Sequence, residues 1–272
     1  MKVILTESQY KFLLEFQKRS YSFDWDDNIL MMPTKIHLEK NVNDKWIPED
    51  VSTEEFREVR HLLGKEYRLL NSSPLDAFKD FREYQAFIID TEKAISSNKF
   101  GPSFNKFKEA LIYGNDFSII TARANPPAAI KEGIKVLIDM TFSNSEKDIM
   151  LDNLNGLTLD QYLNLQDYHP VSSKEFMDKF NISGEASNPE VAKTIALKQF
   201  VERVVAATKK LEGEGDFTGL SVGFSDDDLG NVKKAEEFIK QELKNLYPNV
   251  RFLVYDTSDP KNPKKKRIII EK

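Results

Sequence analysis

Short apolar segments alternate with amphipathic helical segments through the second half of the chain, and this alternation restricts the possible folds more than any other feature. Strands are expected at 116–121 (DFSIIT), 219–225 (GLSVGFS) and 250–256 (VRFLVYD). Helical periodicity covers 127–140, 189–211 and 231–246. Strands and helices that alternate in this way form right-handed βαβ units, whose parallel sheet is covered by helices on both faces. The sequence therefore predicts an α/β fold with a mostly parallel sheet.

The ends of the chain and its middle are expected to add smaller elements. Residues 2–5 suit a short strand or the lead-in to a helix, and helical periodicity follows through Phe16. A further core strand is expected near 167–173, within the otherwise polar stretch 141–188. The turn-forming residues after 256 predict a terminal hairpin with a last strand at 267–270.

The first hundred residues follow a different pattern, with signals for a hairpin and short capped helices. A strand is expected at 21–23, and the alternation over 31–51 predicts a β-hairpin. Ser52 and Glu55 have the spacing of a capping box, which opens a helix that Gly64 can end. Further helices are expected from Pro74, with Ser73 as its cap, and over 103–113.

Acidic residues follow two of the apolar strands at the edge where open α/β sheets build their sites. Asp24 and Asp26 come directly after the strand at 21–23, and a spacing of two lets both side chains point into one crevice. Asp226 and Asp227 follow the strand at 219–225. Several ionised carboxylates in one volume repel one another unless a cation neutralises them, and oxygen ligands favour Mg²⁺. The cluster predicts a hard divalent metal, with Lys193 as the only other counter-charge expected inside it.

Two further polar groups are placed to join the cluster. Thr121 ends a third strand, and Lys193 lies in the first turn of the helix that begins near Pro189. Lys198 is a competing lysine further along the same helix. A carboxylate nucleophile, Mg²⁺, a hydroxyl and an ammonium group together supply what phosphoryl transfer needs.

In these four segments the sequence resembles the haloacid dehalogenase (HAD) superfamily of phosphohydrolases. YSFDWDDNIL (21–30) is similar to its DxDx[TV] motif, FSIIT (117–121) to its second motif, Lys193 to its lysine and SVGFSDDDLGN (221–231) to its acidic motif. The resemblance covers about 20–30 and 103–256, and the opening ILTESQYKFLLE suggests a phage-encoded member.

The resemblance implies a role for each matching residue and a Rossmann-like three-layer core. Asp24 would be the nucleophile that forms an aspartyl-phosphate, and Asp26 the general acid and base. Thr121 and Lys193 would bind phosphoryl oxygens. The ligands of Mg²⁺ would be Asp24, the backbone carbonyl of Asp26, Asp226 and Asp227.

The resemblance also implies a domain organisation, and the sequence departs from the family's motifs at two positions. Many members of the superfamily carry a cap after the first motif, so we expect an α+β cap at 32–102 and a core of 1–31 with 103–272. Asn28 stands where the family usually has Thr or Val, and Asn231 where a further Asp is common. The expected function is hydrolysis of a phosphomonoester, whose substrate is a nucleotide, a nucleic-acid end or a small phosphorylated metabolite.

Other interpretations of the same residues stay open. Asp24 and Asp26 also suit a turn at the end of a strand, and Asp27 and Asp228 suit a solvated or helix-capping role. Arg123 suits a contact with substrate phosphate, a helix cap or a solvated position. A binding protein on a HAD scaffold without turnover is one alternative function, supported by Asn28 and Asn231. A phospho-acceptor signalling domain is another, although no acceptor Asp is evident on a clear strand between Asp27 and Thr121.

Composition excludes several kinds of site. The 272 residues include no Cys, so neither a disulfide nor a thiolate metal site can form, and His37, His61 and His169 lack metal-ligand spacing. The formal net charge of −5 argues against a protein whose main task is to coat nucleic acid. Because no long apolar run is present, we expect a cytoplasmic protein without membrane contact.

Overall fold

A six-stranded sheet with the order β6-β5-β1-β7-β8-β9 forms the centre of the molecule. The computed structural model describes residues 19–184, 188–212, 219–259 and 261–268. The strands are β1 (Arg19–Phe23), β5 (Phe117–Thr121), β6 (Asp167–Pro170), β7 (Ser221–Asp226), β8 (Arg251–Asp256) and β9 (Lys264–Ile268). In this order, neighbouring strands from β6 through β8 are parallel to each other, and the edge strand β9 is antiparallel to β8. The predicted mostly parallel sheet is therefore confirmed.

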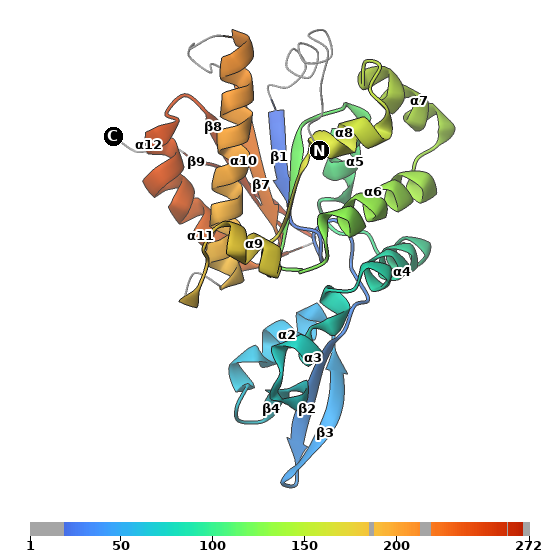
Figure 1. The fold of residues 1–272 in the computed structure, drawn as a ribbon, viewed down its shortest axis with the longest axis vertical. Coiled ribbons are helices and arrows are strands. Elements are labelled where there is room, and N and C mark those ends of the chain that lie inside the picture. Colours follow the sequence, from blue (N-terminus) through green and yellow to red (C-terminus); the bar gives the residue numbers. More distant parts are fainter. Residues whose placement is uncertain (1–18, 185–187, 213–218, 260, 269–272) are drawn as a thin grey trace.

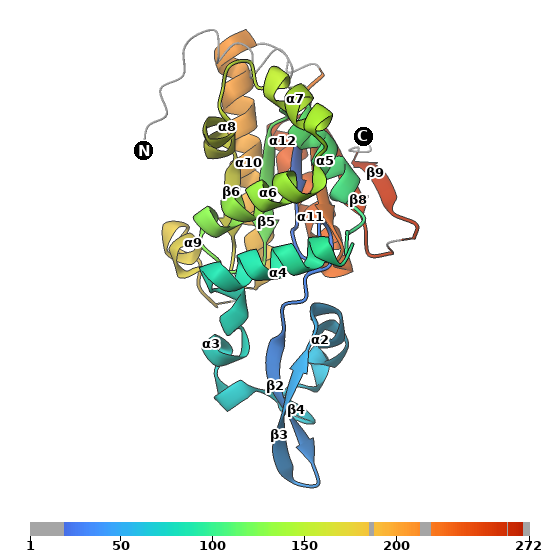
Figure 2. The ribbon, with the colours of Figure 1, turned by 90° about the vertical axis from the view of Figure 1, so that its right-hand side faces the viewer.

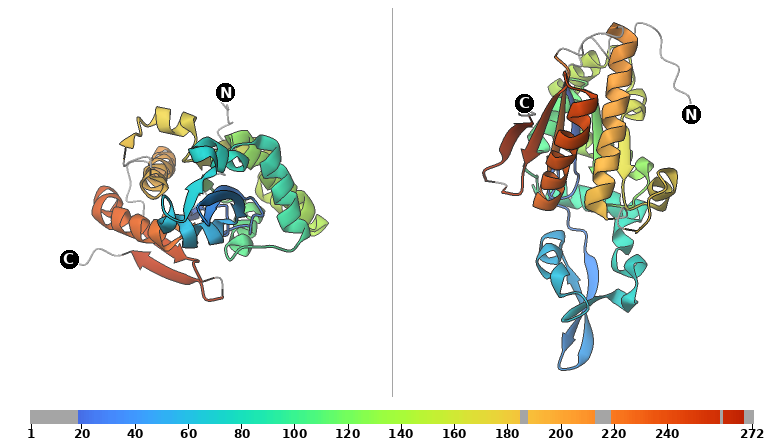
Figure 3. Two further views of the ribbon diagram at one scale, coloured as in Figure 1. Left: turned by 90° about the horizontal axis from the view of Figure 1, so that it is seen from below. Right: turned by 90° about the vertical axis from the view of Figure 1, so that its left-hand side faces the viewer.

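Helices cover both faces of this sheet, as the alternating pattern predicts (Figures 1 and 3). One face packs against α10 (Pro189–Glu212) and α11 (Leu229–Phe238), which continues as η5 (Ile239–Leu243) and α12 (Lys244–Leu246). The other face packs against α5 (Phe104–Ile112) and α6 (Pro127–Thr141). The polar stretch 141–188, for which the sequence predicts no helix, contains three shorter helices: α7 (Asn144–Asn153), α8 (Leu159–Leu165) and α9 (Lys174–Lys179).

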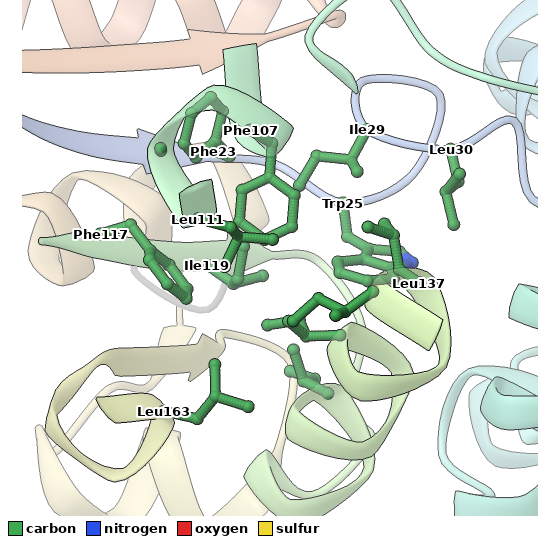
Figure 4. Close-up of a cluster of buried hydrophobic side chains, with 14 of the residues drawn as sticks. Phe23, Trp25, Ile29, Leu30, Phe107, Leu111, Phe117, Ile119, Leu137 and Leu163 are labelled. Atoms are coloured by element: carbon green, nitrogen blue, oxygen red, sulfur yellow. The ribbon is translucent and has the colours of Figure 1, made fainter. Parts of the chain in front are cut away.

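Aromatic rings fill the core on the α5 and α6 side, directly beneath the first acidic motif. Trp25 is fully buried, with its ring centroid 5.2 Å from that of Phe87 and 6.4 Å from that of Phe107. Phe107 also contacts Phe23 and Phe117 edge to face (Figure 4). Burial of such rings contributes about 2–3 kcal/mol each. The loop that carries Asp24 and Asp26 is thus anchored by the residue between them.

A second, three-stranded sheet lies between β1 and β5 in the sequence. Its strands, in the order β3-β2-β4, are β2 (Ile36–Val42), β3 (Lys45–Val51) and β4 (Tyr67–Leu69). Around it are α2 (Thr53–Val59), η1 (Arg60–Leu62), η2 (Leu70–Ser72), α3 (Pro74–Ala77) and η3 (Lys79–Phe81). We call residues 36–81 the insert. It has its own small buried cluster and extends from the end of the main sheet at which β1 ends (Figures 1 and 2).

Helix α4 (Tyr84–Ser96) lies inside the range predicted for the cap but packs against the core. Its buried residues Phe87, Ile88, Ala94 and Ile95 belong to the same cluster as Phe23 and Phe107. The contact with α6 is close, because a Cβ at Gly133 would lie only 2.5 Å from Cε1 of Phe87. Helix α4 is therefore part of the hydrophobic core beside the larger sheet and not part of the insert.

Other expected elements are observed with small differences. The hairpin is β2 and β3, and Ser52 and Glu55 form the predicted capping box, although α2 ends at Val59, well before Gly64. The last strand begins at Lys264, so the predicted start at 267 is wrong. The elements expected at 2–16 lie outside the described residues. Within the described part of the chain, none of the helices has the length and apolar character needed to span a membrane.

Candidate functional site

The carboxyl ends of three adjacent strands bring the acidic motifs together. β1 lies between β5 and β7, and Phe23 is in register with Ile119 on one side and Ser225 on the other. The backbone N–H of Asp24 donates to the carbonyl of Ser225 over 3.0 Å. Because all three strands run parallel, the residues that follow them meet at one edge, and Thr121 and Asp226 lie there with Asp24.

Lys193 joins the first acidic motif to the second. Its Nζ donates to Oδ2 of Asp24 and to Oδ2 of Asp226, each over 2.8 Å, and all three side chains are buried. Burial alone would lower the pKa of Lys193, but the two carboxylates outweigh it and raise the pKa above its ordinary value. The lysine is therefore a permanent cation. Lys198, the competing lysine, pairs with Glu242 on the outside of the core.

Asp24 is held in one orientation and carries conflicting electrostatic influences. Its Oδ1 accepts from the backbone N–H of Trp25 over 2.8 Å, while its Oδ2 accepts from Lys193. Burial raises the pKa of Asp24 well above its ordinary value, Lys193 acts in the opposite direction, and Asp226 and Asp227 add to the rise. A further positive charge near this group would favour its ionised form.

The carboxylates of Asp24, Asp226 and Asp227 are arranged so that they can share a metal ion. One oxygen from each lies within 4.8 Å of the others, and all three residues are buried. An all-oxygen donor set with no His or Cys suits a hard ion such as Mg²⁺. Asp226 is oriented for this by Asn231, whose Nδ2 donates to Oδ1 of Asp226 over 2.9 Å. An Asp at position 231 could not make this contact when ionised, so the departure from the family pattern has a local function here.

Asn28, the other departure, belongs to the scaffold of the site. It is fully buried, and its Nδ2 donates to the carbonyls of Asp24 and Ser225 over 3.2 and 3.1 Å. Its Oδ1 accepts from the hydroxyls of Ser225 and Thr257. These contacts tie the loop after β1 to β7, and a Val at this position could make none of them.

The carboxylate of Asp26 lines the same cavity as Asp24 and Asp227 and pairs with Arg123. Nε and Nη2 of Arg123 donate to Oδ2 and Oδ1 of Asp26 over 2.8 and 2.7 Å. Thr121 is close to the same carboxylate, with Oγ1 3.5 Å from Oδ2 of Asp26. Arg123 is buried, so the solvated and helix-capping roles considered for it are wrong.

The insert contributes cations and a hydroxyl that sequence reasoning missed. Nη2 of Arg57 donates to Oδ2 of Asp227 over 2.6 Å, and Oγ1 of Thr53 donates to Oδ2 of Asp27 over 2.5 Å. Arg60 lies 3.8 Å from Asp228. The expectation that Lys193 is the only counter-charge in the cluster is therefore wrong. Arg57 and Arg60 are three apart on a helical turn and so share one face, but no sequence signal shows which carboxylates that face meets.

These groups surround one cavity of about 150 Å³ between the insert and the main sheet. Its walls include carboxylates from both motifs, although not that of Asp226. The core also contributes Lys193 and Thr121, and the insert contributes Thr53, Arg57 and Arg60. Burial raises the pKa of Asp227 to about 7 and that of Asp27 to about 6, against the influence of Arg57. The expectation that Asp27 is simply solvated is wrong, whereas Asp228 caps α11 as considered. His37, His61 and His169 are all described, and none of them lines this cavity.

Comparison of the chain with protein-family models, with curated proteins and with solved structures finds no match.

Proposed function

We propose that this chain is a Mg²⁺-dependent phosphomonoester hydrolase that acts through an aspartyl-phosphate intermediate on Asp24. The observation that supports it most is the convergence of Asp24, Asp226, Asp227 and Lys193 in one buried cluster that opens to a cavity. Buried carboxylates with perturbed pKa values in a cavity are typical of catalytic sites. The resemblance to the HAD superfamily rests on the same residues.

The proposed reaction has two displacement steps. An oxygen of Asp24 attacks phosphorus, the bond from phosphorus to the leaving oxygen breaks, and Asp26 gives its proton to that oxygen. Water then attacks phosphorus, Asp26 takes a proton from the water, and the bond to Asp24 breaks to release inorganic phosphate. Lys193 and Thr121 would bind the phosphoryl oxygens through both steps.

Three buried carboxylates fit a resident Mg²⁺, and Asp24, Asp226 and Asp227 would hold it. When bound, the ion would neutralise the carboxylates and the phosphoryl charge. The orientation of two of these carboxylates is fixed by hydrogen bonds: Asp24 accepts from the N–H of Trp25, and Asp226 accepts from the side chain of Asn231.

The insert is the proposed source of substrate choice. It supplies Phe56, Arg57 and Arg60 to the cavity on the side opposite the main sheet, where a leaving group would lie. Contacts to the leaving group discriminate substrates, while the phosphoryl group is common to all of them. A nucleotide, a nucleic-acid end and a small phosphorylated metabolite all remain candidate substrates.

A phospho-acceptor signalling domain is the second candidate. It requires an acceptor Asp at the end of a middle strand, and β1, which ends before Asp24, lies between β5 and β7. The two functions differ in the lifetime of the aspartyl-phosphate, which a hydrolase clears rapidly and a signalling domain keeps. A binding protein without turnover is less favoured, since Asn28 and Asn231 both have structural partners.

The test is hydrolysis of p-nitrophenyl phosphate with Mg²⁺, with EDTA and with the Asp24→Asn variant. We expect turnover with Mg²⁺, none with EDTA, and a loss of about 10³-fold or more in the variant, which keeps its fold because Asn is nearly isosteric. Full activity in EDTA, or in the folded variant, would reject the proposed function.

A further inference from the structure

Resting on the proposed function, we propose that Arg123 is a positioning residue, which fixes the carboxylate of Asp26 so that it faces the leaving group. The sequence suggested Arg123 as a phosphate ligand, a helix cap or a solvated residue. The contacts of the buried guanidinium support a different role.

Arg123 binds Asp26 at two points. Nε donates to Oδ2 over 2.8 Å and Nη2 donates to Oδ1 over 2.7 Å. A planar two-point contact fixes both the position of a carboxylate and its rotation, which a single ammonium contact cannot do. The side chain of Arg123 is 0% exposed, whereas that of Asp26 is 14% exposed and lines the cavity. Both residues line the cavity, but the carboxylate is the more exposed member of the pair.

The guanidinium is itself held by further hydrogen bonds and by two aromatic rings. Nη2 also donates to Oγ1 of Thr34 over 2.6 Å, and Nη1 to Oδ1 of Asn125 over 3.3 Å. The rings of Phe81 and Phe87 lie 4.6 and 5.2 Å from its central carbon. Four of the five N–H donors of the guanidinium are thus engaged with protein groups, which favours a positioning role over direct binding of a substrate phosphate.

Most of the residues that hold Arg123 come from the chain between β1 and β5, and Asn125, which follows β5, is itself tied to that segment. Thr34, Phe81 and Phe87 lie in that segment, and Nδ2 of Asn125 donates to the carbonyl of Glu83 over 2.8 Å. The orientation of Asp26 therefore depends on how the insert and α4 join the core. A role in positioning predicts that losses on substitution depend on the leaving group, because only poor leaving groups need a well-placed proton donor.

The test compares wild type, Arg123→Lys, Arg123→Gln and Asp26→Asn on aryl and alkyl phosphates that span good to poor leaving groups. We expect Arg123→Gln to lower kcat about 10²-fold for the poorest leaving groups and less than about tenfold for p-nitrophenyl phosphate. Arg123→Lys, which keeps the charge but offers one contact, should fall between wild type and Arg123→Gln. The double variant with Asp26→Asn should be no slower than Asp26→Asn alone, since both changes remove the same function.

Binding of inorganic phosphate to each variant separates positioning from phosphate recognition. A positioning residue leaves the inhibition constant of phosphate and KM within about twofold of wild type. Weaker phosphate binding by Arg123→Lys and Arg123→Gln would overturn the inference, as would an equal loss for every leaving group. Circular dichroism and a cooperative melt establish that each variant is folded. If Arg123→Gln is not folded, the comparison of Arg123→Lys with wild type tests the inference. A wild-type chain that hydrolyses none of the esters would reject the proposed function, which is a distinct result.

Discussion

Lys193 donates to Oδ2 of Asp24 over 2.8 Å although the two residues are 169 positions apart in the chain. The same Nζ lies 2.8 Å from Oδ2 of Asp226, so one buried cation bridges the carboxylates at the ends of β1 and β7. This contact links the folding of α10 to the electrostatics of the candidate site.

Replacing Lys193 by Met should destabilise the protein by about 3–5 kcal/mol, because two buried carboxylates lose their counter-charge. Mg²⁺ should recover part of the loss, since it supplies positive charge to the same groups. Urea unfolding with and without Mg²⁺ measures both effects. Lys198→Met, on the same helix, is the matched control and should cost less than about 1 kcal/mol, because Lys198 pairs with Glu242 on the surface. Equal losses in the two variants would contradict the assignment of Lys193.

Arg57→Ala should tighten Mg²⁺ binding about two- to fivefold. The guanidinium of Arg57 lies 2.6 Å from Oδ2 of Asp227, a proposed metal ligand, and competes with the ion for that oxygen. The gain is small because Arg57 is partly exposed and solvent screens the contact. Titration calorimetry with the metal alone measures it. Arg60→Ala is the control, since Arg60 lies 3.8 Å from the neighbouring Asp228. Unchanged or weaker binding by Arg57→Ala would show that Arg57 does not compete with the metal.

His169, which does not line the cavity, should make the protein less stable at acidic pH. Burial lowers the pKa of His169 to about 4, from an ordinary value of about 6.5 in the unfolded chain. The unfolded state therefore binds a proton first as the pH falls below about 6.5, and stability is lost from there down to about pH 4. The loss from this group should reach about 2 kcal/mol near pH 5.

Urea unfolding of wild type and His169→Gln near neutral pH and near pH 5 tests this expectation. The variant should lose about 2 kcal/mol less than wild type between the two conditions. His61→Gln, at an exposed position on η1, should behave as wild type does. The same pH dependence in His169→Gln and wild type would contradict the role given to His169.

Much of the main sheet could be predicted from the sequence because its signals are local. The strand that ends at Thr121 is a short, mostly apolar run, and the helix that begins at Pro189 starts with a proline at its first position. Helix α7 was missed because it is mostly polar and buries only Met150. Its position depends on contacts with α5, which no local pattern records.

The residues of the candidate site that could be predicted from the sequence are mainly those at the ends of neighbouring strands. Asp24, Thr121 and Asp226 come together because each follows one of three adjacent parallel strands. Arg57 could not be placed, since its contact with Asp227 spans 170 positions and depends on how the insert folds back. The pairing of Arg123 with Asp26 was missed for a similar reason, because it requires the aromatic contacts from the insert and α4.

The central claim is that Asp24 carries the phosphoryl group during turnover, and reductive trapping tests it most directly. Borohydride added during steady-state hydrolysis of p-nitrophenyl phosphate with Mg²⁺ reduces an aspartyl-phosphate to homoserine, which peptide mass spectrometry can locate. We expect homoserine at position 24, dependent on both substrate and Mg²⁺, and none in Asp24→Asn. Turnover by the wild-type chain with no modification at position 24, or with modification at another carboxylate, would contradict the account.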